Sequence, residues 1–286
     1  MEGHLDTVDR LDTRQFLLAV KKLADSLGYG SDRSPFLGSG FEYVQSRLYQ
    51  YGDPVRAIDW RVTARTGKPH VKEYETPRRM PCYLLLDTSA SMAVSSGPRS
   101  KYAVALHLAG GLAFACLDRI SPVGVVGVGG KELRVEPSLS SARVLEWLHQ
   151  LRRFRYDEPT RIAARVTDLA PTLTSRSLVL ALSDLHDPDA VDALKLLAQR
   201  HDVAVFQVLD PAEVGLPGGG FLRAREAETG RAFVTRARKA WTDQQAVAAE
   251  LRKCGIDHLV VRTDESFVAR VRHFCRTRGL LGRGAR

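Results

Sequence analysis

The sequence predicts an α/β protein with a doubly wound, mostly parallel sheet that is covered by helices on both faces. Short apolar runs alternate with helical patterns along residues 80–278, the order that specifies parallel βαβ units. Residues 82–86 are apolar throughout, as expected of a strand buried on both faces. With 286 residues, 44% of them hydrophobic and 26% charged, the chain can bury a sizeable core.

The first predicted element is an amphipathic helix over residues 13–27. Phe16, Val20 and Leu23 recur at helical spacing, and Gly28 follows as a stop signal. An apolar stripe of this kind usually docks on the body of the same protein. We therefore expect residues 1–79 to form an N-terminal helix and a second segment that pack on a main domain of residues 80–278.

That second segment is rich in arginines, acids and aromatic residues, and we expect it to be structural rather than catalytic. An arginine fork pairs bidentately with a carboxylate, so alternating charges can hold irregular backbone in place. Residues 68–75 then read as a strand that leaves the segment. The members of this predicted network are Glu42, Arg47, Asp53, Arg56, Asp59, Trp60 and Arg65.

The main domain is expected to contain six strands and six helices. Helix 100–119 is apolar on most sides and carries Gly110 and Gly111, which we expect to let it pack closely on the sheet. A hairpin insertion is expected near 217–237, and the Gly- and Arg-rich end, 279–286, reads as a flexible basic tail. The predicted strands are 82–86, 123–128, 133–137, 177–182, 203–209 and 258–261, and the other helices are 142–151, 160–169, 189–199, 242–252 and 265–277.

Polar side chains follow the first buried strand in the pattern Asp87-x-Ser89-x-Ser91. Ligands of open α/β sheets bind in the crevice outside the carboxyl ends of the strands. One carboxylate and two hydroxyls on alternate residues of a tight loop supply the hard oxygens that Mg²⁺ prefers. Asp184 ends the apolar run 177–182 in the same way and is the expected second acid. A turn or a helix cap is the alternative reading of such a cluster.

Several motifs in this order resemble the bacterial family catalogued as domain of unknown function 58. The resemblance covers roughly residues 30–210 and implies a von Willebrand factor A-like domain with a metal-ion-dependent adhesion site. It also implies a protein-interaction module that works with a MoxR-type AAA+ ATPase in chaperone-like maturation or assembly of other proteins. The matching motifs are Arg33-Ser34-Pro35, Gly38-x-Gly40-x-Glu42, Arg47-x-Tyr49, Gly52-Asp53-x-x-Arg56-x-Ile58-Asp59-Trp60, Ala64-Arg65-Thr66, Val71-Lys72-x-Tyr74-Glu75 and Asp87-x-Ser89-x-Ser91-Met92.

The resemblance adds a fifth residue to the metal site. In the adhesion-site pattern a threonine from a later loop also binds the metal, and Thr160 is the match, with helix N-capping as its alternative role. The expected ion is Mg²⁺, with Mn²⁺ or Ca²⁺ as alternatives, and an acidic side chain of a protein partner would replace one of its waters. Two departures lie outside the metal motif: Asp32 stands where the family often has histidine, and Thr76-Pro77 where it has further glutamates.

Composition narrows the remaining function classes. The formal net charge of +9 and the basic clusters at 236–239 and 270–278 would suit a nucleic acid, but no nucleic-acid motif accompanies them. The four cysteines form no Cys-x-x-Cys pair, which indicates a reducing, cytoplasmic setting. The longest apolar stretch, 103–117, is shorter than the roughly 20 residues of a membrane span, so we expect a soluble protein.

Enzyme signatures are also missing from the sequence. It has no Gly-x-x-x-x-Gly-Lys-Ser/Thr loop, no Gly-x-Ser-x-Gly elbow and no His-Glu-x-x-His helix. Ser89 stands where an aspartyl-phosphate phosphatase would need a second aspartate. A non-enzymatic interaction module is therefore the expected class, and a magnesium-dependent phosphoester hydrolase is the alternative.

Overall fold

The computed structural model describes residues 13–28, 42–75, 80–93, 95–153, 159–214, 221–225, 232–236 and 244–278. The chain divides into two compact units, one made of Met1–Tyr29 and Met80–Arg286 and the other of Gly30–Arg79. Residues 1–79 were expected to form a helix and a second segment that pack on the main domain. The first helix lies in the unit that contains the sheet, because its apolar face packs there.

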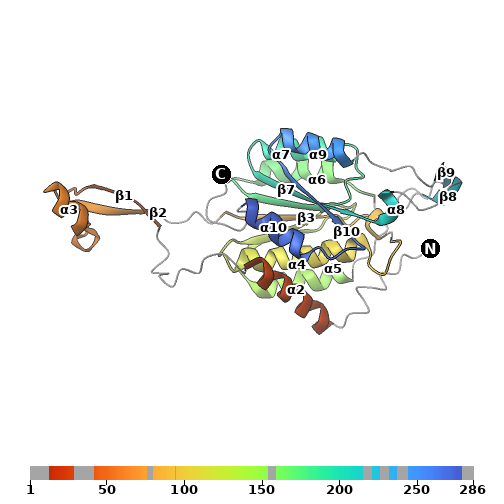
Figure 1. The fold of residues 1–286 in the computed structure, drawn as a ribbon, viewed down its shortest axis with the longest axis horizontal. Coiled ribbons are helices and arrows are strands. Elements are labelled where there is room, and N and C mark those ends of the chain that lie inside the picture. The colour runs from red at the N-terminus through yellow and green to blue at the C-terminus, as the bar shows by residue number, and fades with distance from the viewer. Residues whose placement is uncertain are drawn as a thin grey trace. The chain divides into compact units, whose positions relative to one another are not determined.

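The larger unit is built on a six-stranded sheet with the strand order β10-β7-β6-β3-β4-β5, in which only β5 is antiparallel (Figure 1). The predicted α/β fold with a mostly parallel sheet is confirmed. From β3 the chain builds β4 and β5 on one side and then returns to place β6 on the other, so the strand order reverses between β3 and β6. The strands are β3 (Cys82–Leu86), β4 (Val123–Gly127), β5 (Arg134–Ser138), β6 (Leu178–Ser183), β7 (Asp202–Leu209) and β10 (Asp257–Arg262).

Helices cover both faces of this sheet (Figure 1). Side chains of successive strand residues alternate between the faces, so Leu84 and Leu86 enter one core cluster while Tyr83 and Leu85 enter the other. The first cluster lies under α4 (Lys101–Leu117), α5 (Ser141–Arg152) and α10 (Val268–Arg278). The second lies under α6 (Ile162–Leu169), α7 (Ala190–Ala198) and α9 (Gln244–Lys253).

Helix α2 (Thr13–Gly28) packs against α4 and completes the first core cluster. A Cβ atom added to Gly110 would lie 2.9 Å from the Val20 methyl groups, and one added to Gly111 would lie 2.4 Å from Leu23 Cδ2. The two glycines therefore allow α2 to pack closely on α4. The expectation that they let α4 pack closely on the sheet was wrong. Val20 and Leu23 fill the space that larger side chains on α4 would occupy.

The smaller unit contains elements that the sequence analysis missed. Strand β1 (Glu42–Leu48) pairs antiparallel with β2 (His70–Glu75), and a short helix α3 (Trp60–Thr66) lies between them in sequence, after a 3-10 turn at Val55–Ala57. Gly67 ends α3 in the left-handed region, with φ of 71°, where a side chain would be strained. Only a strand was expected here, at 68–75, and it is observed as β2.

The remaining described elements complete the larger unit. Two 3-10 turns lie at Ala90–Ala93 and Ala170–Thr172, and the short helix α8 (Pro211–Val214) follows β7. Strands β8 (Phe221–Arg225) and β9 (Ala232–Arg236) pair antiparallel as the expected hairpin. Within the described ranges, no helix is both long and apolar enough to cross a membrane. The predicted tail 279–286 and part of the basic cluster at 236–239 lie outside the described residues.

Candidate metal centre

Asp87 begins the loop that leaves β3 and is fully buried at the point where the strand order reverses. Its backbone N–H donates to the Leu182 carbonyl at 2.9 Å, which extends the β3–β6 ladder by one residue. The Ser89 N–H donates to Asp87 Oδ1 at 3.0 Å, and this bond turns the chain sharply after the strand. The loop then closes in a 3-10 turn, because the Met92 N–H donates to the Ser89 carbonyl.

Asp184 reaches the same point from β6. Leu86 pairs with Leu182 in the parallel register, so the residues that follow the two strands lie side by side. The Ser91 hydroxyl donates to Asp184 Oδ2 at 2.8 Å, and Ser89 Oγ lies 3.0 Å from Ser91 Oγ. The Ser183 hydroxyl donates to Asp87 Oδ2. Four of the five predicted ligands, Asp87, Ser89, Ser91 and Asp184, thus lie in one buried hydrogen-bonded cluster.

Thr160 is half-buried in the loop before α6. The Arg161 N–H donates to the Val128 carbonyl at 2.8 Å, which places this loop at the carboxyl end of β4 and at the same edge of the sheet. Arg161, not Thr160, is the N-cap residue of α6, and the Ala163 N–H donates to the Asp187 carboxylate. The N-cap position thus belongs to Arg161, and the role of Thr160 as a metal ligand stays a prediction.

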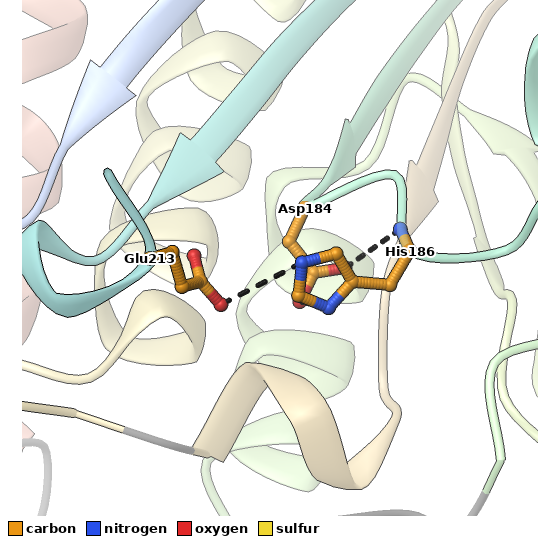
Figure 2. A group of neighbouring side chains, drawn as sticks. All are labelled: Asp184, His186 and Glu213. Atoms are coloured by element: carbon orange, nitrogen blue, oxygen red, sulfur yellow. Dashed lines mark hydrogen bonds and ion pairs between the residues drawn. The ribbon is translucent and has the colours of Figure 1, made fainter. Parts of the chain in front are cut away.

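Three ionisable residues at this site were not expected from the sequence: Lys101, His186 and Glu213. Lys101 opens α4 with a fully buried side chain, and its ammonium group donates to Asp184 Oδ2 at 2.7 Å and to Glu213 Oε1. His186 Nδ1 lies 3.3 Å from Asp184 Oδ2, and its Nε2 lies 3.7 Å from Glu213 Oε1. Figure 2 shows the side chains of Asp184, His186 and Glu213 facing one another.

Burial and charge set the protonation of this cluster. Burial, reinforced by the charge of Asp184, raises the pKa of Asp87 to about 7. Burial also acts to raise the pKa of Asp184, but the charges of Lys101 and then His186 outweigh it, so that this pKa is lowered. For Lys101, burial acts to lower the pKa, and the two carboxylates reverse the effect. Asp184 and Lys101 therefore form an ion pair, while Asp87 titrates near neutrality.

A chain of amide and imidazole groups supports the cluster from the neighbouring strands. Gln207 of β7 is fully buried and its Nε2 donates to the Asp184 carbonyl at 3.1 Å. That leaves Gln207 Oε1 to accept from His258 Nε2 of β10, at 2.8 Å. The chain fixes the backbone of Asp184 and ties the site to the far edge of the sheet.

The family model described as "Protein of unknown function DUF58" matches residues 45–253, most of the chain and parts of both units. The chain belongs to the DUF58 family. Uncharacterized proteins Mb1516 of Mycobacterium bovis and Rv1480 of Mycobacterium tuberculosis are each 30% identical over 282 residues, covering 93% of this chain and 88% of the relative. Uncharacterized protein MAV169 of Mycobacterium avium is 33% identical over 116 residues, 36% of this chain and 67% of the relative.

In this DUF58 chain, the predicted structural network of the smaller unit divides into two contacts. Arg47 pairs bidentately with Asp53, at 2.7 and 2.8 Å, and the hydrogen bonds from Arg47 hold the pKa of Asp53 down at about 2. Asp59 is buried and caps α3 by accepting from the N–H groups of Arg61 and Val62, while its other oxygen accepts from the Ser46 hydroxyl.

Among the other predicted members of that network, the exposed side chains of Arg56, Trp60 and Arg65 differ from the expectation. The side chains of Arg56 and Arg65 are exposed, and neither pairs with a carboxylate within the described part of the chain. Trp60 is 68% exposed, so it adds little to a core. Glu42 pairs with Glu75 in the β1–β2 ladder, but its side chain lies outside what the structure describes.

The donors at the switch point of this DUF58 fold suit a divalent cation. Asp87, Ser89, Ser91 and Asp184 offer only oxygen atoms, the donor type that Mg²⁺ and Mn²⁺ take. A second set shares Asp184: one ligand atom each from Asp184, His186 and Glu213 lie within 4.8 Å of one another. The nitrogen donor in the second set favours a transition metal over magnesium.

Proposed function

We propose that this chain is a non-enzymatic, metal-dependent protein-interaction module with a von Willebrand factor A-like domain. Asp87, Ser89, Ser91 and Asp184, joined by Thr160, would hold Mg²⁺ at the carboxyl edge of the sheet. The observation that carries the proposal is the single buried hydrogen-bonded cluster that these four residues form across the reversal of strand order. Bound Mg²⁺ would supply an electrophilic coordination position for a carboxylate of the partner.

The charges of the cluster support this role. Two carboxylates nearly neutralise a divalent ion, while hydroxyl ligands add no charge, so that an open position can still attract one further carboxylate. Asp87 and Asp184 are the two carboxylates, and both are fully buried. Resemblance to the family adds the expected partner, a MoxR-type AAA+ ATPase or its client, and a role in chaperone-like maturation or assembly of other proteins.

Metal binding is tested by titrating the full chain with Mg²⁺ in a calorimeter. Wild-type protein should bind one ion, and Asp87→Asn should bind none while its circular dichroism spectrum is unchanged. Asp168→Asn, which changes an exposed carboxylate on α6, is the matched control and should bind as wild type does. Equal affinity of the wild-type and Asp87→Asn proteins for Mg²⁺ would contradict the proposed metal site.

Partner binding is tested by co-purification of the MoxR-type ATPase with the full chain. Recovery should fall in chelator, return with Mg²⁺, and be lost in Ser89→Ala. Ser141→Ala, at an exposed serine on α5, is the matched control. Equal recovery in every lane would show that the metal site does not mediate this contact.

A magnesium-dependent phosphoester hydrolase is the second candidate, and one observation favours it. Asp87 has a pKa of about 7, and a carboxyl group that titrates near neutrality can act as a general acid or base. Turnover of p-nitrophenyl phosphate that requires Mg²⁺ and disappears in Asp87→Asn would support this candidate. We expect no such turnover.

A further inference from the structure

The buried cation of the site is the side chain of Lys101. Its ammonium group is fully buried at the first turn of α4, after the N-cap residue Ser100. Two effects oppose this position, because burial of a charge is costly and the amino end of a helix carries partial positive charge. Among the residues that the structure describes, the carboxylates of Asp184 and Glu213 are in contact with the ammonium group and offset these costs.

The ammonium group of Lys101 contacts the Asp184 oxygen that a metal ion would need as a ligand. Asp184 Oδ2 accepts from Ser91 and is thus the carboxylate oxygen that faces the predicted ligands. The same oxygen lies 2.7 Å from Lys101 Nζ. An ion bound to Ser91 and Asp184 would place its charge close to this ammonium group, and the two cations would repel each other.

We infer that Lys101 competes with the divalent ion for Asp184, and that an ion enters the site by displacing the ammonium group from Asp184 onto Glu213. The inference rests on the proposed function and adds to it an intrachain control of metal affinity. Glu213 already contacts Lys101, so the displaced ammonium group keeps one carboxylate partner. The exchange is balanced in charge, because Asp87 and Asp184 then neutralise the ion while Glu213 neutralises Lys101.

The short helix α8 gives Glu213 a fixed place for this exchange. Glu213 Oε2 accepts from the Asp210 N–H at 3.1 Å, directly after β7, so Glu213 is anchored through one oxygen while the other meets Lys101. Asp210 is itself buried and accepts from Ala212 N–H at 3.0 Å and from the Thr263 hydroxyl at 3.3 Å. Glu213 is therefore held ready as the second partner of Lys101.

The test measures Mn²⁺ binding by the full chain through the electron paramagnetic resonance signal of the free ion, with fold checked by circular dichroism. Lys101→Met removes the competing charge and should bind Mn²⁺ at least tenfold more tightly than wild type. Glu213→Gln removes the second partner, keeps Lys101 on Asp184, and should bind at least tenfold more weakly. Lys195→Met, which removes an ion-paired lysine on α7, is the control and should match wild type.

Opposite shifts in the two variants separate competition from a merely structural ion pair, which would weaken binding in both. If Lys101→Met fails to fold, Lys101→Gln takes its place with the same expected tightening, and an affinity of both variants equal to wild type overturns the inference. If Lys101→Met binds Mn²⁺ and the wild-type protein does not, the result supports the inference but contradicts the proposed binding of metal by the wild-type protein. Binding by wild type that neither variant alters overturns the inference and leaves the proposed function intact. Absence of binding in all variants overturns both.

Discussion

At the scale of single residues, Asp87 is an acid in an environment that is unfavourable for its charge. The pKa of Asp87 is about 7 in the folded chain and near 3.8 when unfolded, because burial and the charge of Asp184 disfavour its ionised form. A group whose pKa is higher in the folded state stabilises the fold at pH values below its unfolded pKa. For Asp87 this stabilisation is lost as the pH rises through 7, its pKa in the folded state. The ionised Asp87 side chain therefore lowers the stability of the metal-free protein at alkaline pH.

We accordingly expect Asp87→Asn to stabilise the metal-free protein at pH 8. The asparagine amide keeps an acceptor for the Ser89 N–H and removes the buried charge. A shift of about three pKa units corresponds to a destabilisation by that charge of roughly 2 to 4 kcal/mol. The measurement is the urea midpoint of both proteins at pH 8 in chelator. A midpoint for Asp87→Asn equal to or below that of wild type would contradict this account of the charge.

His258 gives a pH dependence of the opposite sign. Burial, with a smaller contribution from the charge of Arg252, lowers its pKa to about 4. The neutral ring contributes stability that is present above the unfolded value near 6.5 and is lost as the pH falls toward 4, at most about 3 kcal/mol. His258→Gln should lose less stability than wild type between pH 7.5 and pH 5 in urea titrations. Parallel losses in the two proteins would show that His258 is not responsible.

At the scale of elements, the smaller unit depends on one helix cap. Asp59→Ala removes the acceptor for two N–H groups of α3 and for Ser46, and caps of this kind contribute about 1 to 2 kcal/mol. Amide exchange in α3, followed by mass spectrometry, should therefore accelerate roughly five- to thirtyfold. Arg56→Ala, at an exposed side chain, is the matched comparison and should leave this exchange unchanged. Equal acceleration in both variants would mean that Arg56 belongs to the structural network after all.

The contact between α2 and α4 depends on the absence of side chains on α4. Gly111→Ala would place a Cβ atom 2.4 Å from Leu23 Cδ2, and overpacking of this kind costs about 1 to 3 kcal/mol. The double variant Gly111→Ala/Leu23→Ala should lose less stability than the sum of the two single variants, because the smaller residue 23 makes room. Strict additivity in denaturant titrations would contradict direct packing of these two residues.

Some of the missed elements had a signal in the sequence. Asp59 before Trp60 and Gly67 after Thr66 are an N-cap residue and a stop residue with seven residues between them, which bound a short helix. The alternating acids and arginines of the whole segment, 42–65, instead favoured irregular backbone held by ion pairs. Strand β1 carried a weaker signal, because a shift of register between Tyr43 and Gln45 interrupts its alternation.

At the scale of the whole molecule, the sheet and two of its acids were predictable, whereas the surroundings of those acids were not. Apolar runs that end in Asp87 and Asp184 show that each acid follows a strand, but not that β3 and β6 are neighbours. Lys101 reaches Asp184 across 83 residues and Glu213 across 112, so no local pattern links them. The fold class can therefore be predicted from periodicity, whereas the position of Lys101 beside Asp184 depends on the order of the strands.

We propose that the switch point between β3 and β6 binds a divalent ion at Asp87, Ser89, Ser91 and Asp184. The most direct test is a crystal structure of the full chain grown with Mn²⁺, with the ion located by its anomalous scattering. We predict a single strong peak next to these four side chains, with the Lys101 ammonium group on Glu213. A peak between His186 and Glu213, or no peak at this edge of the sheet, would contradict the account.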